Sequence, residues 1–325
     1  RQAALAAGIP NTAPSTTVNK VCSSGAKSIM FAAESIMLGR GDLLVAGGME
    51  NMSAIPYYIP KARFGYKYGN ETLIDGLHKD GLQDPYEGIA MGIFADQTAE
   101  KYGITREEQD AYAIRSYQNT SLNSKNGVFA SEIVGVSVQT RKDEPILIVE
   151  DEEHKNVKFE KIPHLHAAFS PKGTVTAANA STMNDGAAAL ILASATAIRK
   201  YNLKPLARIL SFADSAHEPA WFTTAPTYAA PKALSLAKLA LTDVDYFEVN
   251  EAFSVVPLAF NKILNININK INVLGGAVSL GHPLGASGAR IVVTLQNILE
   301  YKNATIGCAA ICNGGGGASS IVIER

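Results

Sequence analysis

Three short stretches of this 325-residue chain carry side chains that could do covalent chemistry. Cys22 follows an apolar run and precedes a turn of small residues. His282 lies in a loop of glycine and proline, and Cys312 is followed by one asparagine and four glycines. A cysteine that is activated by a histidine attacks carbonyl carbon well, and a thioester is a suitable substrate. Backbone N–H groups of the glycines could hold the negative charge that then develops on oxygen.

The two cysteines suit different tasks. Cys22 precedes a helix predicted from apolar residues on one face, and the helix macrodipole there favours a thiolate. Cys312 ends an apolar strand, where its thiolate could act as a general base. Plain structural interpretations remain open: Cys22 as a buried structural cysteine, and the glycines as a tight turn. Cys308, inside an apolar strand, is interpreted as core packing.

The composition restricts the class of protein. The chain is 47% hydrophobic and 18% charged with a net charge of -1, which suits a soluble globular protein. This charge gives no reason to expect nucleic acid or a membrane surface as partner, and no apolar run is long enough to span a bilayer. Three cysteines are too few for a disulfide scaffold and favour a reducing compartment.

Alternating strands and helices are expected to position these residues. Apolar runs that end at turn residues predict strands, and apolar residues on one face predict helices. Strands are expected at 18–21, 43–46, 187–192, 206–213, 246–249 and 271–274. Helices are expected after Cys22 and Thr105, and at 196–201, 229–240 and 253–264.

An internal repeat relates two helices. The apolar positions 29, 30, 33, 36 and 37 recur at a constant offset of 262 residues, and a Gly-Ala pair is expected to open each helix. Two similar halves of alternating strands and helices predict α/β layers with mostly parallel strands.

Four motifs, in this order, resemble those of the thiolase family over essentially the whole chain. They are V-C-S-S-G around Cys22, N-E-A-F at 250–253, the glycine-rich stretch 275–290, and C-N-G-G-G-G at 312–317. The stretches 173–181 and 310–324 are most similar to biosynthetic acetoacetyl-CoA thiolases of the fungal cytosolic type.

The resemblance implies a thiolase fold. Two similar βαβ-rich halves would form α-β-α-β-α layers with an inserted loop domain over the coenzyme A (CoA) site. The implied N-terminal half comprises 1–52 and 167–204, the insertion 53–166, and the C-terminal half 205–325. The family has a strand–helix–strand segment before the point where this chain starts, so N-terminal strands are expected to be missing.

The resemblance also implies roles for the catalytic residues. Cys22 would become acetylated, His282 would activate it, and Cys312 would move a proton at the methyl carbon of a second acetyl-CoA. Asn250 would hold a water that, with His282, stabilises the enolate oxygen, and it is alternatively a helix N-cap. The N–H groups of Cys22 and Gly314 would form the other oxyanion hole.

Substrate and cation contacts follow from the same resemblance. The positions expected to contact CoA are Met91, Tyr117, Asn156, Lys161, Phe169, Ser181 and Phe253. Two residues of this region depart from common family patterns. Asn156 stands where an arginine often meets the nucleotide end, and Ala90, which precedes Met91, stands where many relatives have histidine. The positions that would enclose K⁺ are Tyr117, Ala177, Ala178, Ala180 and Val278, with plain packing as the alternative.

The activity implied is the reversible condensation of two acetyl-CoA to acetoacetyl-CoA and CoA, with no covalent cofactor. The resemblance places this step first in the mevalonate and sterol pathway, in a cytoplasmic homo-oligomer (dimer or tetramer). The alternatives are a degradative 3-ketoacyl-CoA thiolase, a mitochondrial location, and a catalytically silent protein that keeps the fold for subunit assembly.

Overall fold

The computed structural model describes residues 1–139 and 144–325, so residues 140–143 of the expected insertion lie outside the described part. The helices are α1 (Gln2–Ala6), α2 (Ser24–Met37), α3 (Met91–Tyr102), α4 (Arg106–Lys125), α5 (Ala195–Tyr201), α6 (Pro226–Leu236), α7 (Val255–Leu264), α8 (Ala277–Leu280) and α9 (Leu284–Tyr301). The strands are β1 (Leu43–Asn51), β2 (Tyr57–Tyr58), β3 (Ile74–Asp75), β4 (Val136–Val138), β5 (Ile146–Ile148), β6 (Asp185–Ala193), β7 (Arg208–Ala216), β8 (Tyr246–Val249), β9 (Ile306–Asn313) and β10 (Gly317–Glu324).

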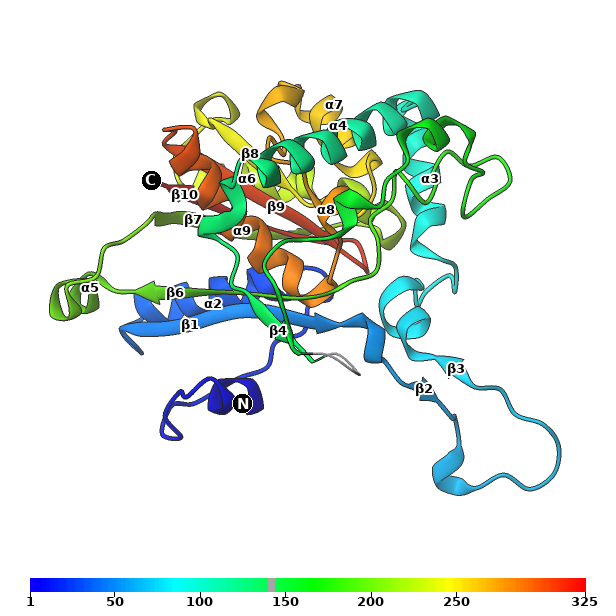
Figure 1. Ribbon diagram of the computed structural model, residues 1–325, viewed down its shortest axis with the longest axis horizontal. Coiled ribbons are helices and arrows are strands. Elements are labelled where there is room, and N and C mark those ends of the chain that lie inside the picture. Colours follow the sequence, from blue (N-terminus) through cyan, green and yellow to red (C-terminus); the bar gives the residue numbers. More distant parts are fainter. Residues whose placement is uncertain (140–143) are drawn as a thin grey trace.

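Helices and sheets alternate in layers, as Figure 1 shows. The largest sheet has the strand order β7-β10-β9-β8, with α6 on one face and α9 on the other. Helices α2 and α9 pack against each other, and both contact the two-stranded sheet β1-β6. The central pair of helices therefore lies between the two sheets, and the residues that begin these helices meet at one end of the layer.

The two central helices touch through small residues. A Cβ on Gly25 would lie 2.6 Å from the Ala289 nitrogen, and a Cβ on Gly288 would lie 2.5 Å from the Ala26 nitrogen. This reciprocal contact fits the predicted repeat, because each helix presents the same Gly-Ala pair to the other. The expected boundary was wrong: the pair lies inside both helices, since α9 begins at Leu284 and α2 at Ser24.

Several strand predictions need correction. Segments 18–21 and 271–274 form isolated bridges and turns instead of strands, because few backbone groups there pair with a neighbour. The strands of the main sheet are mostly antiparallel, and among its pairs only β8–β9 is parallel. The β9–β10 hairpin accounts for one antiparallel pair, because a tight glycine turn can join only antiparallel strands. The helix expected at 229–240 is displaced to α6 (Pro226–Leu236).

The sheet β1-β6 is buried on one face only. Gly47 and Gly48 do not end the strand, because β1 continues to Asn51. A larger residue would not fit at either position, since a Cβ there would lie within 2.3 Å of a carbonyl oxygen of β6 or α9. The opposite face of the sheet exposes apolar side chains, so the strand expected at 187–192 is present but is buried on one face only. The exposed side chains are Leu43, Val45, Met49 and Ile191.

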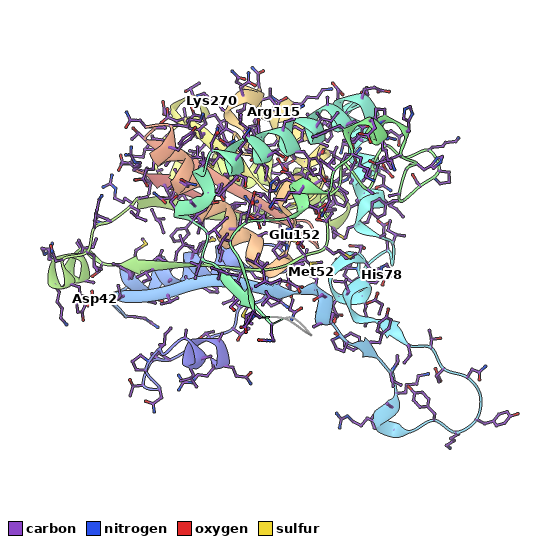
Figure 2. All side chains as sticks on the ribbon, in the orientation of Figure 1. Asp42, Met52, His78, Arg115, Glu152 and Lys270 are labelled. Atoms are coloured by element: carbon purple, nitrogen blue, oxygen red, sulfur yellow. The ribbon has the colours of Figure 1, made fainter. Side chains whose placement is uncertain are left out.

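The inserted residues reach the core through α4. Its predicted capping box is present, with Thr105 accepting from Glu108 N–H and Glu108 accepting from Thr105 N–H. Figure 2 shows Arg115 on α4 and Lys270 on the same side of the molecule, away from Met52 at the end of β1. No helix in residues 1–139 and 144–325 is both long and apolar enough to cross a membrane.

Candidate active site

Cys22 lies on a tight turn directly before α2. Its predecessor Val21 has φ 49°, a left-handed conformation that costs free energy for a β-branched residue. Polar contacts hold this turn: the Val21 N–H donates to Asn19 Oδ1 (2.9 Å), and Ser24 Oγ donates to the Val21 carbonyl (2.6 Å). The turn fixes the position of the Cys22 side chain at the start of the helix.

Ser23 connects the segments that carry the two predicted catalytic cysteines. Its hydroxyl lies 3.4 Å from the Ile311 carbonyl oxygen and 3.0 Å from Asn313 Oδ1, the residues on either side of Cys312. Ser23 is fully buried, and Cys312 is 1% exposed. The end of β9 is therefore held against the turn that carries Cys22.

His282 is brought to the same place by the packing of the central helices. It lies just before α9, and a Cβ on Gly25 would lie 3.1 Å from the carbonyl oxygen of Gly285. Glu50 lies at this junction, because it accepts from the Gly285 N–H (3.0 Å) and its charge raises the pKa of Cys22. The His282 N–H reaches the Thr182 carbonyl (3.2 Å), which anchors the loop.

Ser287 sets the tautomer of His282. The Ser287 hydroxyl lies 3.0 Å from the Pro283 carbonyl oxygen and 2.6 Å from His282 Nδ1. A carbonyl only accepts, so the hydroxyl donates its single proton to Pro283 and accepts from Nδ1–H. Nε2 of His282 is then the free base. Burial, together with the positive charge of Arg290, lowers the pKa of His282 to about 3, which keeps the ring neutral.

Asn250 faces this base directly. It follows β8, and its Nδ2 lies 3.4 Å from His282 Nε2. Asn250 is 1% exposed, and its Oδ1 has no hydrogen-bond partner in the described part of the chain. A buried acceptor without a partner is where an ordered water or a substrate oxygen is expected. Asn250 does not act as the N-cap of α7, because Ser254 holds that position.

Burial disfavours the thiolate form of both cysteines. Burial raises the pKa of Cys22 to about 12, although the N–H groups of Gly314 and of Cys22 itself act in the opposite direction. Burial and the neighbouring Cys22 also raise the pKa of Cys312. The start of the helix was expected to favour a thiolate, and burial acts against this by raising the pKa of Cys22. The same two N–H groups are directed at the Cys22 sulfur, so they lie beside the place where a carbonyl bonded to that sulfur would be.

Four of the residues predicted to contact CoA form a continuous surface next to the cysteines. A Cβ on Gly314 would lie 3.6 Å from Met91 Cε, and the Phe169 ring lies against Gly92. Phe169 meets Phe253 edge to face with ring centroids 6.1 Å apart. Ser181 lies beside Phe253, since its N–H and hydroxyl both reach the Ala252 carbonyl (3.1 and 2.9 Å).

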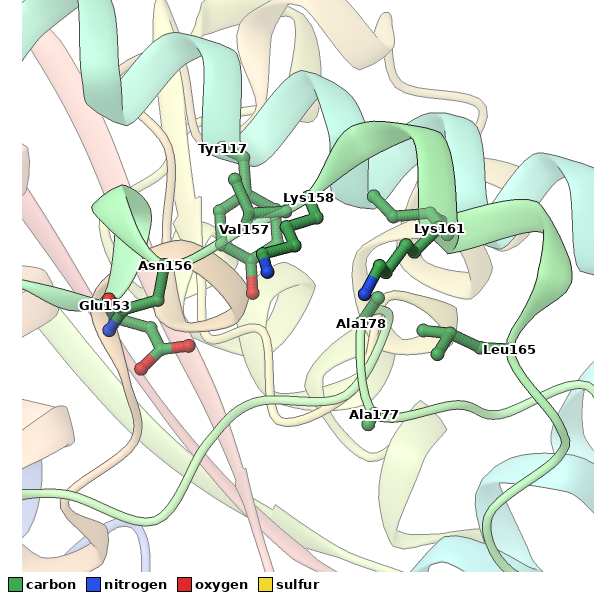
Figure 3. Close-up of a pocket in the computed structure, with 10 residues that line it drawn as sticks. Tyr117, Glu153, Asn156, Val157, Lys158, Lys161, Leu165, Ala177 and Ala178 are labelled. Atoms are coloured by element: carbon green, nitrogen blue, oxygen red, sulfur yellow. The ribbon is translucent and has the colours of Figure 1, made fainter.

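The other predicted contacts line a pocket of about 260 Å³, shown in Figure 3. Tyr117, Asn156, Lys161, Ala177 and Ala178 line it, together with Glu153, Val157, Lys158, Ile162 and Leu165. Lys161 points toward Ala178 in Figure 3. Burial raises the pKa of Tyr117, and the charges of Glu153 and Glu251 raise it further.

The expected cation ligands partly coincide with this pocket. Tyr117 and Val278 belong to one buried apolar cluster, and Ala180 forms a bridge with Phe253. In the described residues no group of three or more His, Cys, Asp or Glu side chains could hold a metal ion. That observation does not test a site made of carbonyl oxygens, so the K⁺ site stays a prediction.

Comparison with known families agrees with this geometry. Residues 1–196 match the family model described as "Thiolase, N-terminal domain", and residues 203–325 match "Thiolase, C-terminal domain". The chain belongs to the thiolase family. The two matches confirm the thiolase fold expected from the four motifs. Together with the names of the relatives, they show that the chain is an enzyme of the acyltransferase class.

Three curated relatives of this thiolase align over the whole chain. A "Probable acetyl-CoA acetyltransferase" of Dictyostelium discoideum is 55% identical and is covered to 78% of its length. The "Acetyl-CoA acetyltransferase ERG10, cytosolic" of Gibberella zeae is 50% identical (82% covered), which agrees with the expected fungal type. The "Acetyl-CoA acetyltransferase, mitochondrial" of Mus musculus is 52% identical (76% covered).

Solved structures share the fold of this thiolase. The structure titled Acat5 thiolase from Ascaris suum in complex with coenzyme A is 47% identical, with a TM-score of 0.94. The similarity covers 100% of this chain and 82% of the Ascaris chain.

Sequence reasoning missed four residues around the catalytic group. Ser23 and Ser287 stood inside the quoted motifs, but small residues there were interpreted only as turn formers. Glu50 lies near the end of β1 and Glu153 lies in a charged segment, and neither carries a local signal for its place beside the site.

Proposed function

We propose that this thiolase is an acetyl-CoA C-acetyltransferase, which condenses two acetyl-CoA to acetoacetyl-CoA and CoA and catalyses the reverse cleavage. The observation that carries this proposal is the junction made by Ser23, which holds Cys312 against Cys22. Two thiols and one neutral histidine supply the nucleophile and the bases that such a condensation requires. The names of the relatives support the same activity.

The first half of the reaction transfers an acetyl group to Cys22. His282 Nε2 removes the thiol proton while the sulfur attacks the thioester carbonyl of acetyl-CoA. The N–H groups of Cys22 and Gly314 hold the oxyanion. Collapse breaks the carbon–sulfur bond to CoA, and the CoA thiolate takes the proton of Cys312. Acetyl-Cys22, a protonated His282 and a Cys312 thiolate remain.

The second half forms the new carbon–carbon bond. The Cys312 thiolate removes a proton from the methyl group of the second acetyl-CoA. The protonated His282 and a water held by Asn250 stabilise the enolate oxygen. The enolate carbon then attacks acetyl-Cys22, and the released Cys22 sulfur regains its proton from His282. Acetoacetyl-CoA leaves with the second CoA attached.

The test compares substrates of different length. We expect CoA-dependent cleavage of acetoacetyl-CoA, measured by the loss of its ultraviolet absorbance, to exceed cleavage of a long-chain 3-ketoacyl-CoA by at least about tenfold, which corresponds to about 1.4 kcal/mol of barrier. Faster cleavage of the long-chain substrate would favour the degradative 3-ketoacyl-CoA thiolase. No cleavage of either, together with no acetylation of Cys22, would favour the silent protein.

We further propose that the inserted loop domain (53–166) lies over the CoA site between two thiolase halves, 1–52 with 167–204 and 205–325. Contacts within the pocket support this, because Asn156 and Lys161 of the insertion face Ala177 and Ala178. CoA binding should therefore protect insertion residues in hydrogen–deuterium exchange, and protection confined to residues outside 53–166 would contradict the assignment.

The cellular role proposed is the first step of the mevalonate and sterol pathway in the cytoplasm. The cytosolic Gibberella relative supports this, whereas the mouse relative of similar identity keeps a mitochondrial location as the alternative. Fractionation of cells that express the full-length protein would decide between the two compartments.

We propose a homo-oligomer, a dimer or a tetramer. The apolar face of the β1-β6 sheet supports this, since Leu43, Val45, Met49 and Ile191 are 48–69% exposed in the single chain. Light scattering of the full-length protein that gives the mass of one chain at micromolar concentration would contradict this proposal.

The proposed K⁺ site predicts a cation-dependent rate. If Tyr117 and the carbonyls of Ala177, Ala178, Ala180 and Val278 enclose K⁺, turnover should rise with K⁺ at constant ionic strength. Tyr117→Phe removes the hydroxyl oxygen that would bind K⁺ and should reduce this response. Equal rates in K⁺ and in a large organic cation such as tetramethylammonium would rule the site out.

A further inference from the structure

The two N–H groups that face the Cys22 sulfur come from different elements. The N–H of Cys22 belongs to the turn before α2, and the N–H of Gly314 belongs to the turn between β9 and β10. Such a pair of donors stabilises an oxyanion only while both are held at a fixed distance from the developing charge. The spacing of this pair therefore depends on what joins the two turns.

The glycine turn needs a tie to its surroundings, because its own backbone is permissive. Gly315 and Gly316 have φ 85° and 83°, left-handed values that glycine adopts readily. The far end of the turn is fixed to the segment after β7, where the His217 N–H donates to the Gly316 carbonyl (3.0 Å). The near end lies against the turn before α2, since a Cβ on Gly314 would lie 3.9 Å from Val21 Cγ1. A tie on that side would fix the Gly314 N–H against the nucleophile.

The side chain of Asn313 provides this tie. Its Nδ2 lies 2.8 Å from the Gly314 carbonyl oxygen, and its Oδ1 lies 3.0 Å from the Ser23 hydroxyl. A carbonyl only accepts, so the amide nitrogen faces Gly314 and the amide oxygen faces Ser23. Ser23 donates its single proton to Asn313, because the Ile311 carbonyl oxygen lies farther away, at 3.4 Å. The tie thus runs from the residue after the first N–H donor to the residue before the second.

The tie is buried, which keeps it in one arrangement. Asn313 is 7% exposed and Ser23 is fully buried, so water does not compete for either group. Gly317 pairs with Asn313 across the hairpin, and a Cβ on Gly317 would lie 2.7 Å from Asn313 Nδ2. The amide therefore occupies the space that a side chain at position 317 would fill. A buried amide that is hydrogen-bonded at both ends holds its neighbours in a defined geometry.

We propose that Asn313 is a positioning residue that sets the spacing of the two oxyanion donors. It does so through one hydrogen bond from the Ser23 hydroxyl and one to the Gly314 carbonyl. This inference rests on the proposed function, in which the N–H groups of Cys22 and Gly314 hold the oxyanion of acetyl transfer. Asn313 acts through the backbone of Gly314 and needs no contact with the substrate.

The carbonyl stretching frequency of acetyl-Cys22 tests this spacing directly. Hydrogen bonds to a carbonyl oxygen polarise the C=O bond and lower its frequency. The protein is acetylated with acetyl-CoA that carries a heavy carbon isotope in the carbonyl, and the isotope-edited infrared spectrum is recorded after CoA is removed. Wild type should absorb at a lower wavenumber than the same thioester in a solvent without hydrogen-bond donors. Asn313→Leu and Ser23→Ala should both absorb at a higher wavenumber than wild type.

The same variants should slow acetylation without weakening substrate binding. A misplaced oxyanion donor lowers the maximal rate of acetyl transfer, because its interaction is made in the transition state. We expect single-turnover acetylation to fall by about ten- to a hundredfold in each variant, with the half-saturating concentration of acetyl-CoA unchanged. The double variant should lose no more than Asn313→Leu alone, because both substitutions remove one shared tie.

Two matched controls remove buried hydrogen bonds elsewhere. Asn297→Leu removes an asparagine that is 6% exposed and donates to the Val128 carbonyl (2.9 Å). Ser320→Ala removes a serine that is 1% exposed and donates to the Ala309 carbonyl (2.8 Å). Both controls should keep the wild-type carbonyl frequency and acetylate within about threefold of the wild-type rate, as expected for substitutions at independent sites.

The frequency separates a positioning role from a structural one. A purely structural role for Asn313 predicts a lower unfolding temperature with the carbonyl frequency unchanged. An unchanged frequency in both variants overturns the inference, whether or not the rate falls. A double variant whose loss is the product of the two single losses also overturns it, because the two residues then act separately. If Asn313→Leu does not fold, Ser23→Ala decides alone, since it leaves the bond between Asn313 and Gly314 in place.

Failure of the proposed function would look different. If wild type itself carries no acetyl group on Cys22, the proposed function fails. If wild type is acetylated there and the Asn313 and Ser23 variants keep its carbonyl frequency, only the present inference fails.

Discussion

Cys22→Ser should abolish acetylation and lower turnover by roughly four to six powers of ten, the loss that follows removal of a catalytic nucleophile. A serine hydroxyl is far less acidic than a thiol, and His282 is a weak base because burial and Arg290 lower its pKa to about 3. The ring therefore cannot take a hydroxyl proton as it takes that of the thiol. The measurement is acetyl incorporation from acetyl-CoA, located by mass spectrometry of the intact protein and its peptides.

The pH dependence of this acetylation follows from the same two groups. The resting form has a Cys22 thiol, with its pKa raised to about 12, and a neutral His282, with its pKa lowered to about 3. The imidazole is thus free to accept a proton from about pH 4 upward. Acetylation of the wild type should consequently change little between pH 6 and pH 9. A steep fall toward pH 6 would mean that His282 is protonated there and is not the resting base.

Cys308→Ser is the matched control for both catalytic cysteines. Cys308 is fully buried on β9, and its sulfur lies 3.3 Å from the Ser320 hydroxyl, which a serine could also contact. Acetylation of Cys308→Ser should occur on Cys22 at a rate within about twofold of wild type. An acetyl group found on Cys308 or Cys312 in Cys22→Ser would contradict the assignment of the nucleophile.

The catalytic residues were predictable because local sequence carries their chemistry. A cysteine before a helix, a histidine in a glycine loop and a cysteine before four glycines are each visible in a few residues. Their meeting depends on long-range contacts that no local pattern contains. Ser23 reaches across to the end of β9, and Gly25 and Gly288 allow two helices more than two hundred residues apart to touch.

The failed strand predictions have a common physical cause. A short apolar run satisfies the pattern of a buried strand, but a strand also needs a neighbour that pairs with its backbone. Segment 18–21 instead ends in the left-handed Val21 that presents Cys22, and strain of this kind at a functional site has no periodic signal. Pairing direction is equally non-local, and for this reason the mostly antiparallel main sheet was not predicted.

Cys312→Ser should separate the two halves of the reaction. Attack of Cys22 on acetyl-CoA uses His282 and the N–H groups of Cys22 and Gly314, all of which remain. Departing CoA takes the proton of Cys312 in the wild type, and in this variant it can take the proton of protonated His282 instead. Proton removal from the second acetyl-CoA needs a base that is not itself acetylated, and Cys22 cannot serve once it carries the acetyl group. We therefore expect acetyl-Cys22 to accumulate, while condensation and cleavage fall by about two to four powers of ten, the usual cost of losing a general base.

The hydrogen bonds of Ser23 make Cys312→Ser a clean test. Ser23 contacts the backbone of Ile311 and the side chain of Asn313, not the sulfur of Cys312, so the substitution leaves the junction between β9 and the Cys22 turn in place. The deciding measurement is acetyl incorporation beside turnover with acetoacetyl-CoA, in Cys312→Ser and in the Cys308→Ser control. Turnover near the wild-type rate in Cys312→Ser would show that Cys312 is not the base. Loss of acetylation in that variant would show that departing CoA depends on the proton of the buried Cys312 thiol, so that Cys312 is essential to both half-reactions.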